Sequence, residues 1–430
     1  MPRAKPSLLL EKGFLPETLP PSFTSNSFAK FASTRPTMFA AYTGRKRLKG
    51  VSYSCSKAGY SRRQFYLPHP ISQYYLVEFI DSNNAAITTF IATSQFSVSK
   101  PQPDLSNERA ITITPFNELH KIVHDRLGSC AFIARTDIQA FYPSVYTHAI
   151  PWAFHGKAAA KADQTTNSPI IYFNKLDRFL RDGQDGQTIG IPVGPDTSRI
   201  VAEILGCAID AELAKNAGKA LVQCVRHVDD IFMDANTRAD AEQCISAFQR
   251  SLREFGLEIN ESKTRVVASS DFLDDRWPRK IKKLIDAYYG DPDRLVEMFE
   301  ESFHLAGEMG SERPVRHLLR WSDKNKHFKT NNWPMLENFL AKCVHHFPHS
   351  IEYACRMLVW HQLKFSDLNK IKWRGIASQA LEYQIGMGHD QQVSHGVFVQ
   401  GAAGAVAGME AVLHHVTPGA SPVRVITEGG

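Results

Sequence analysis

The stretch Leu221-Val222-Gln223-Cys224-Val225-Arg226-His227-Val228-Asp229-Asp230-Ile231-Phe232-Met233 places two adjacent carboxylates between two short apolar runs. Short apolar runs on both sides of a tight turn predict a β-hairpin with Asp229 and Asp230 at its turn. A third carboxylate, Asp137, lies three positions after the end of the earlier apolar run 131–134. Carboxylates carried by separate strands are what a two-metal nucleotidyl-transfer site needs, so this stretch predicts a polymerase centre.

A second acidic pair, Asp274-Asp275, serves as an internal control for this interpretation. It lies in Phe272-Leu273-Asp274-Asp275-Arg276-Trp277-Pro278, without an apolar strand on both sides. We therefore assign this second pair to a solvated turn. The sequence around an acidic pair, rather than the pair itself, carries the prediction.

Length and composition predict a globular chain. It has 430 residues, of which 43% are hydrophobic and 22% charged, enough for two or three domains of about 150 residues each. No run of 18 or more apolar residues occurs, and Leu8-Leu9-Leu10 is too short for a signal peptide. The seven cysteines form no Cys-x-x-Cys or Cys/His cluster, which argues against disulfides and zinc modules and predicts buried thiols in a soluble intracellular protein.

The positive charge is concentrated at the N-terminal end. The chain has a net charge of +6, yet residues 1–63 hold twelve Lys and Arg against only Glu11 and Glu17. Tyrosines and phenylalanines are interleaved with these basic residues, a composition that suits phosphates and stacked bases. The alternative is a solvated basic terminus without a ligand.

The pattern of elements predicts an α+β order for the first two thirds of the chain. Residues 1–50 read as an extended basic arm with a short helix near 25–32. The expected strands are 64–68, 74–80, 131–138, the hairpin around Asp229-Asp230, and a further hairpin of 257–260 with 264–267. The expected helices are 117–129, one beginning near 143, 170–182, 197–216 and 239–255, the last ending at Gly256.

Beyond residue 275 the periodicity becomes helical. The expected helices are 278–289, 294–306, 314–319, 333–347, 351–360 and 371–385, typical of stacked helical hairpins. The last 35 residues are rich in Gly and Ala, a composition that predicts weak order. We thus expect an arm at 1–50, a catalytic domain at 51–275, an α-helical repeat domain at 276–395 and a weakly ordered tail at 396–430.

Two further segments make the acidic pair specific. Asp137-Ile138-Gln139-Ala140-Phe141-Tyr142-Pro143-Ser144 has an aromatic five positions after its Asp, and Gly190-Ile191-Pro192-Val193-Gly194-Pro195 forms a loop before a helix. In this order the three segments resemble motifs A, B and C of the reverse transcriptase superfamily. The resemblance covers residues 60–267 and implies a right-hand polymerase palm and fingers.

The resemblance implies a role for each matching residue. Divalent Mg²⁺ or Mn²⁺ ions about 4 Å apart would activate a 3′ hydroxyl and stabilise the pyrophosphate leaving oxygen. The implied metal ligands are Asp137, Ile138, Asp229 and Asp230. The other implied roles are Lys263 as general acid, Tyr142 as the steric gate against a ribose 2′ hydroxyl, and Pro192, Val193 and Gly194 as contacts of the incoming nucleotide. Arg62 and Arg63 are candidate triphosphate ligands, with a plain surface pair as the alternative.

A closer resemblance is to abortive-infection and other phage-defence reverse transcriptases of bacteria. It rests on segments 19–25, 141–153 and 187–198. Members join the palm and fingers to a C-terminal helical-repeat domain, so the resemblance implies a cytoplasmic bacterial defence enzyme that uses dNTPs, contacts nucleic acid including RNA, and forms homo-oligomers away from membranes. It also implies DNA synthesis without a template from a tyrosine primer. Tyr42, Tyr53 and Tyr60 are candidates, each with an ordinary packed or exposed tyrosine as the alternative.

Two departures argue against faithful templated copying. Val193 stands where many relatives have Gln, and an alkyl side chain cannot hydrogen-bond a sugar. His227 replaces the usual aromatic before the acidic pair. Two rival hypotheses remain: a conventional RNA-templated enzyme of retron or intron type, and a catalytically silent nucleic-acid-binding assembly protein whose odd tail reflects a truncation or frameshift.

Overall fold

The fold is known from a computed structural model. It describes residues 7–19, 23–34, 47–56, 62–107, 109–272, 277–327, 331–365, 368–388 and 390. The chain divides into two compact units. The first comprises Met1–Glu17, Ser22–Ser52 and Phe65–Asp274, and the second Thr18–Pro21, Tyr53–Gln64 and Asp275–Gly430. The three predicted catalytic carboxylates lie in the first unit.

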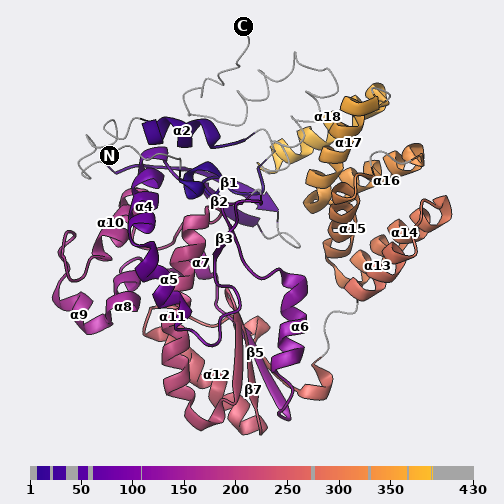
Figure 1. The fold of residues 1–430 in the computed structure, drawn as a ribbon. Coiled ribbons are helices and arrows are strands. Elements are labelled where there is room, and N and C mark those ends of the chain that lie inside the picture. Colours follow the sequence, from indigo (N-terminus) through magenta and orange to yellow (C-terminus); the bar gives the residue numbers. More distant parts are fainter. Residues whose placement is uncertain are drawn as a thin grey trace. The chain divides into compact units, whose positions relative to one another are not determined.

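A four-stranded antiparallel sheet, in the order β6-β7-β5-β8, is the centre of the first unit (Figure 1). Its strands are β5 (Phe132–Asp137), β6 (Gln223–His227), β7 (Asp230–Ala235) and β8 (Arg265–Ala268). Side chains alternate between the two faces of each strand. Because consecutive residues of β5, β6 and β7 are buried, these three strands are buried on both faces, which explains the apolar runs that flank the acidic residues.

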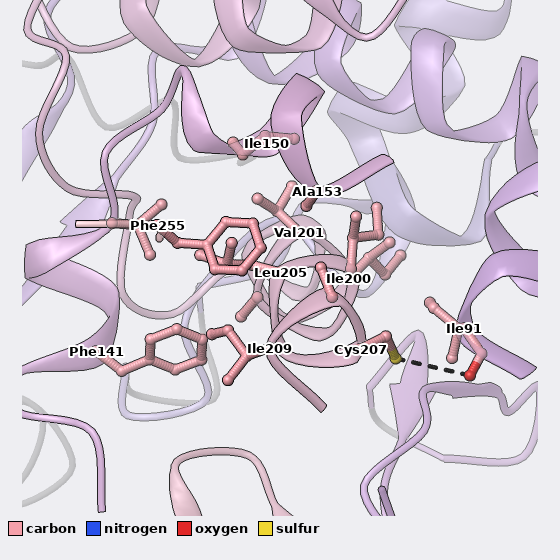
Figure 2. Close-up of a cluster of buried hydrophobic side chains, with 14 of the residues drawn as sticks. Ile91, Phe141, Ile150, Ala153, Ile200, Val201, Leu205, Cys207, Ile209 and Phe255 are labelled. Atoms are coloured by element: carbon pink, nitrogen blue, oxygen red, sulfur yellow. Dashed lines mark hydrogen bonds between the residues drawn. The ribbon is translucent and has the colours of Figure 1, made fainter. Parts of the chain in front are cut away.

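Helices cover the two faces. On one face, α12 (Arg238–Arg253) packs against β5 and β7, and α11 (Asp196–Ala217) packs against α12. On the other face, apolar residues of α6 (Phe116–Arg126) meet Ile133 and Phe232 of the sheet. Figure 2 shows part of the larger core, where Val201, Leu205 and Ile209 of α11 meet Phe141, Ile150 and Phe255. Burial nearly all round makes α11 the central helix of this unit.

The remaining elements of the first unit are short. Its other α-helices are α1 (Leu8–Glu11), α2 (Asn26–Thr34), α4 (Pro70–Ser82), α5 (Asn84–Ala92), α7 (Phe141–Ser144), α8 (Ala149–His155), α9 (Lys157–Ala162) and α10 (Asn174–Asp182). A small two-stranded sheet of this unit pairs β3 (Gln102–Pro103) with β4 (Ile111–Thr112). A second small sheet pairs β1 (Val51–Ser56) with β2 (Arg62–Leu67), and the residues of these two strands are divided between the two units. The predicted helices near 25–32, 117–129, 170–182, 197–216 and 239–255 are confirmed, with shifted ends.

Two predicted strand pairs are wrong. Residues 74–80 belong to helix α4, which starts at Pro70 and is capped by His69 Nδ1 accepting from Ile71 N. Because α4 is buried on most sides, its hydrophobic residues show no helical period that the sequence could reveal. The hairpin expected at 257–267 also does not form, since β8 pairs with β5 and Ile259 makes only an isolated bridge to Ile138.

The second unit contains six of the described helices. They are α13 (Trp277–Asp286), α14 (Pro292–Met309), α15 (Arg313–Lys324), α16 (Trp333–His346), α17 (Ile351–Phe365) and α18 (Lys370–Gly386). All six expected helices are confirmed, and they share one core around Phe299, Leu318 and Met357. The expected domain boundaries at 50, 275 and 395 and the helical-repeat architecture stay predictions.

The cysteines and the helices bear on two further expectations. All seven cysteines are buried and free, as predicted. Among the described helices, none combines the length and the apolar character needed to cross a membrane.

Candidate active site

The acidic pair occupies a tight turn at one end of the central sheet. Strand β6 ends at His227 and β7 begins at Asp230, and these two residues pair across the hairpin. Val228 and Asp229 form the turn between them, and Val228 has a φ of 57°. The predicted hairpin is thus confirmed.

Asp137 lies beside this turn because β5 and β7 are neighbours. Asp137, the last residue of β5, is the cross-strand partner of Asp230, the first residue of β7. Partners in an antiparallel pair have Cα atoms about 4.5 to 5.5 Å apart. Ile138 N donates to Asp229 O at 3.2 Å, which ties the end of β5 to the turn. Carboxylates far apart in the sequence therefore converge.

The clustered charges raise the pKa of the turn carboxylates. Burial, together with the charges of Asp230 and Asp137, raises the pKa of Asp229 to about 6. Burial also raises the pKa of Asp230, although Arg135 and Lys263 oppose this effect. Both groups are half-buried. Mutual repulsion in a partly dry site favours binding of a cation.

Lys263 joins the carboxylates from a separate segment. Its ammonium group forms an ion pair with Asp137 Oδ2, while 57% of its side chain stays exposed. Asn260 N donates to Asp137 O at 2.9 Å and Gln139 N to Glu258 O at 2.9 Å, which fixes the segment that carries Lys263. The structure therefore brings the predicted general acid to the predicted metal ligands.

The carboxylates fit divalent cations, although the described residues contain no group of three or more His, Cys, Asp and Glu side chains already arranged as a metal site. Asp137 Oδ1 is buried and has no hydrogen-bond partner among the described residues. Its other oxygen holds only the ammonium of a largely exposed lysine. Oxygen ligands with unmet negative charge are what Mg²⁺ prefers, so Asp137, Asp229 and Asp230 would hold the ions.

The predicted nucleotide loop packs against the segment that follows Asp137. Ile191 N donates to Tyr142 O at 2.9 Å, and Tyr66 N donates to Val193 O at 3.1 Å. Tyr142 is half-buried; burial raises the pKa of its hydroxyl, which also senses the charges of Arg199 and Asp229. The loop 190–195 is thus held by a main-chain hydrogen bond to Tyr142, whose hydroxyl is near enough to Asp229 for that carboxylate to raise its pKa.

A further ion pair holds this loop and was not predicted. Arg109 pairs with Asp196, the first residue of α11, and also donates to Gly194 O at 3.0 Å and to Leu15 O at 2.6 Å. Gly194 itself has a φ of 128°. The position of Asp196 next to the start of a predicted helix is a signal for an anchoring role. Nothing in the sequence near Arg109 indicates that Arg109 is the partner of Asp196.

Other predicted site residues belong to the second unit. Arg62 and Arg63 belong to the second unit, where Arg62 Nε donates to Ser54 Oγ at 2.7 Å and Arg63 is exposed. Tyr53, in the same unit, is buried with its hydroxyl 2.6 Å from Thr18 Oγ1. The remaining predicted residues, Tyr42, Tyr60 and the Asp274-Asp275 pair, lie outside the described residues.

Comparison with known proteins gives one family match. Residues 83–287 match the family model described as "Reverse transcriptase (RNA-dependent DNA polymerase)". The matched range contains Asp137, Asp229, Asp230 and Lys263. No curated protein matches the chain.

Similar solved structures include three yeast telomerases. Apo telomerase from Candida tropicalis truncated from the C-terminal domain is 14% identical, with a TM-score of 0.35, over 57% of this chain and 56% of that chain. Telomerase from Candida albicans with the TWJ fragment of telomeric RNA is 12% identical, with a TM-score of 0.37, over 91% and 66%. Apo telomerase from Candida tropicalis is 11% identical, with a TM-score of 0.38, over 92% and 74%. The chain thus spans less than two thirds of the first two.

Proposed function

We propose that the chain is a bacterial phage-defence polymerase, in which residues 83–287, matched by the family model described as "Reverse transcriptase (RNA-dependent DNA polymerase)", form the polymerase domain. It joins dNTPs into DNA without a template and starts from a tyrosine of the protein. The observation that carries the polymerase proposal is the convergence of Asp137, Asp229, Asp230 and Lys263 at one end of the central sheet. The rest of the proposal extends to features that the sequence resemblance implies.

The chemistry divides between the bound metals and the protein. Mg²⁺ or Mn²⁺, when bound, activates the attacking hydroxyl and stabilises the leaving pyrophosphate. Asp137, Asp229 and Asp230 hold these ions, with Ile138 as the adjoining main-chain ligand. Lys263 can leave Asp137 because most of its side chain is exposed, and its ammonium then protonates the departing pyrophosphate.

Two contacts support synthesis that does not read a template. Val193 offers only an alkyl side chain beside the nucleotide, and its carbonyl already accepts from Tyr66 N. His227 is buried and its Nε2 lies 2.8 Å from Thr114 O, so its ring is committed to the protein. Nucleotide selection at this loop then rests on shape and on Tyr142, rather than on hydrogen bonds from Val193.

The other parts of the proposal concern partners and place. The enzyme works in the bacterial cytoplasm on dNTPs, contacts its nucleic acid product and RNA, and assembles as a homo-oligomer. The α-helical second unit supplies the oligomer contacts in this proposal. Tyr42, Tyr53 and Tyr60 are the primer candidates, and the burial of Tyr53 requires its segment to open before its hydroxyl can react.

A polymerase assay on the full chain tests the proposal. Purified protein receives labelled dNTPs with Mg²⁺ or Mn²⁺, with and without an added RNA template and DNA primer. We expect labelled DNA without template, part of it attached to protein and released by protease. Asp229→Asn removes one charge at constant shape and abolishes synthesis, whereas Asp125→Asn, at an exposed carboxylate of α6, is the matched control and retains it.

The outcomes separate the rival hypotheses. Strict dependence on added template and primer would establish the retron or intron type of enzyme and exclude untemplated synthesis. Absence of product under every condition, with nucleic acid still bound, would establish the silent assembly protein. Product that survives Asp229→Asn would remove the assignment of the active site.

A further inference from the structure

The turn that carries the acidic pair contains a strained residue. Val228 has a φ of 57°, in the left-handed region that β-branched residues rarely adopt. This conformation is unfavourable for an L-residue because its Cβ comes too close to the following carbonyl oxygen. Such strain persists only where surrounding groups hold it, and it occurs often at functional sites. The groups that hold Val228 therefore deserve identification.

Two buried side chains form hydrogen bonds with the main chain of Val228, and we call these two hydrogen bonds the grip. Ser99 Oγ accepts from Val228 N at 2.8 Å, and Arg226 Nη1 donates to Val228 O at 3.3 Å. The exposed fractions of Ser99 and Arg226 are 2% and 0%. The Val228 carbonyl shares one planar peptide with the Asp229 amide. The grip thus sets the direction in which the chain enters Asp229.

Carboxylates of α11 hold the gripping side chains in turn. Arg226 Nη2 donates to Glu203 Oε1 at 2.9 Å, and Arg226 Nε donates to Asp210 Oδ1 at 2.8 Å. Ser99 Oγ donates to Glu203 Oε2 at 3.3 Å. Glu203 and Asp210 lie seven positions apart, which places both on one face of the helix. The central helix of the unit therefore supports the turn through Arg226 and Ser99.

The helix also leaves space for this arrangement. A Cβ atom at Gly206 would lie 2.6 Å from Arg226 Nη1. Gly206 lies between Glu203 and Asp210 on the buried side of α11. The absence of a side chain lets the guanidinium lie against the helix and reach both carboxylates.

We propose that Ser99 and Arg226, supported by Glu203 and Asp210, are positioning residues that hold Val228 in its left-handed conformation and so fix Asp229 and Asp230 for metal binding. The inference rests on the proposed function, since it deepens the same site. The buried polar network around Arg226 then serves catalysis in addition to stabilising the fold. Misplacement of a reacting group by about 1 Å can lower a rate by about a hundredfold.

Ser99→Ala is the sharpest test because it removes the acceptor of the Val228 amide and leaves Arg226 in place, although it also removes the longer hydrogen bond from Ser99 Oγ to Glu203 Oε2. We expect kcat for dNTP incorporation to fall about tenfold to a hundredfold, with the Mg²⁺ concentration for half-maximal activity raised. Ser94→Ala is the matched control. Ser94 Oγ donates to Asp210 Oδ2 at 2.6 Å, so its loss disturbs the same network without contacting Val228. We expect Ser94→Ala to change kcat by less than about threefold.

The same substitution in a second variant, Val228→Gly, separates an effect on the position of the turn from an effect on the stability of the fold. Glycine adopts the left-handed conformation without strain, so Val228→Gly removes the need for the grip. In the Val228→Gly background, Ser99→Ala should change kcat by less than about threefold. The proposal is overturned if Ser99→Ala lowers kcat equally in both backgrounds, or if Ser94→Ala lowers it as much as Ser99→Ala does.

A direct measurement keeps this test separate from the proposed function. Binding of Mn²⁺ alone to the full chain, followed by electron paramagnetic resonance, needs no synthesis. An inactive wild-type protein refutes the polymerase proposal, and the grip is then judged by Mn²⁺ affinity. Weaker binding by Ser99→Ala but not by Ser94→Ala supports it. Equal binding by all three proteins, or no binding by the wild type, overturns it.

Discussion

Replacement of Arg226 by Met should strongly destabilise the first unit. Arg226 is 0% exposed and pairs with Glu203 and Asp210, which are 4% and 3% exposed. Met fills a similar volume but offers no donor, so two carboxylates are left buried and without their cation. Breaking a buried pair in this way costs about 3 to 5 kcal/mol. One lost cation serves two anions here, so we expect the upper half of that range.

Two companion variants sharpen this prediction. Arg226→Lys keeps the charge on a single nitrogen, which cannot donate along the two directions that the guanidinium uses, so its loss should be smaller than that of Arg226→Met. Replacing Glu203 and Asp210 by Leu in the Arg226→Met background should recover most of the stability. Well-packed apolar residues often replace a buried ion network without loss.

Hydrogen exchange of the β6 and β7 peptides is the suitable assay. Of the six tryptophans, only Trp152 lies in the first unit, so total fluorescence would follow mainly the second. Every 1.4 kcal/mol corresponds to a factor of ten, so about 4 to 5 kcal/mol speeds exchange through opening by roughly a thousandfold to several thousandfold. Exchange within tenfold of wild type for Arg226→Met, or no recovery in the Leu variant, would refute the reasoning.

Three further predictions concern the turn, the central helix and the general acid. Burial and the neighbouring carboxylates raise the pKa of Asp229 from its ordinary value of 3.8 to about 6, so its ionisation destabilises the fold increasingly between these two pH values and fully above the higher one. Without metal, Asp229→Asn should raise the free energy of unfolding by about 1 to 2 kcal/mol at about pH 7.5. Urea unfolding at about pH 4 should show no gain. Gly206→Ala should lower the free energy of unfolding by about 1 to 3 kcal/mol because the new Cβ would meet Arg226. Gly307→Ala in α14 is the control: its Cβ would meet no atom within 4 Å, so the free energy of unfolding measured by calorimetry should rise by about 0.5 to 1 kcal/mol. Lys263→Ala should lower kcat about a hundredfold or more, and pre-steady-state incorporation that is unchanged from pH 6 to 9 would contradict a proton-donating role.

Local patterns predicted most of the first unit's elements. Helix α12 has one apolar face that repeats at the helical period, and the β6–β7 hairpin has an apolar strand on each side of a turn. The sequence therefore shows both elements directly. The pattern failed for residues 74–80, because helix α4 is apolar nearly all round and its short window resembles a strand. It failed again at 257–267, because β8 pairs with β5 and therefore needs a partner far away in the sequence.

The candidate site shows the same division. Local signals in the sequence identify four residues of the candidate site. They are a strand end for Asp137, a tight turn for Asp229 and Asp230, and a short polar segment for Lys263. Arg109 has no such signal, since its partners Gly194 and Asp196 lie 85 and 87 positions further along the sequence. Arg62 and Arg63 have a local signal, but they belong to the second unit, so their role at the carboxylates stays a prediction.

The sequence by itself predicted which carboxylates form the candidate site, because the acidic residues and their turn depend on neighbours within about ten positions. Only the tertiary structure decided what holds them. Arg226 stands in an apolar strand, and Glu203 and Asp210 stand in an apolar helix, where each charge alone reads as an exposed position. Packing of α11 beneath the hairpin buries all three, and burial of charge is tolerated only because the partners meet there. That contact depends on distance in space, which no local pattern records.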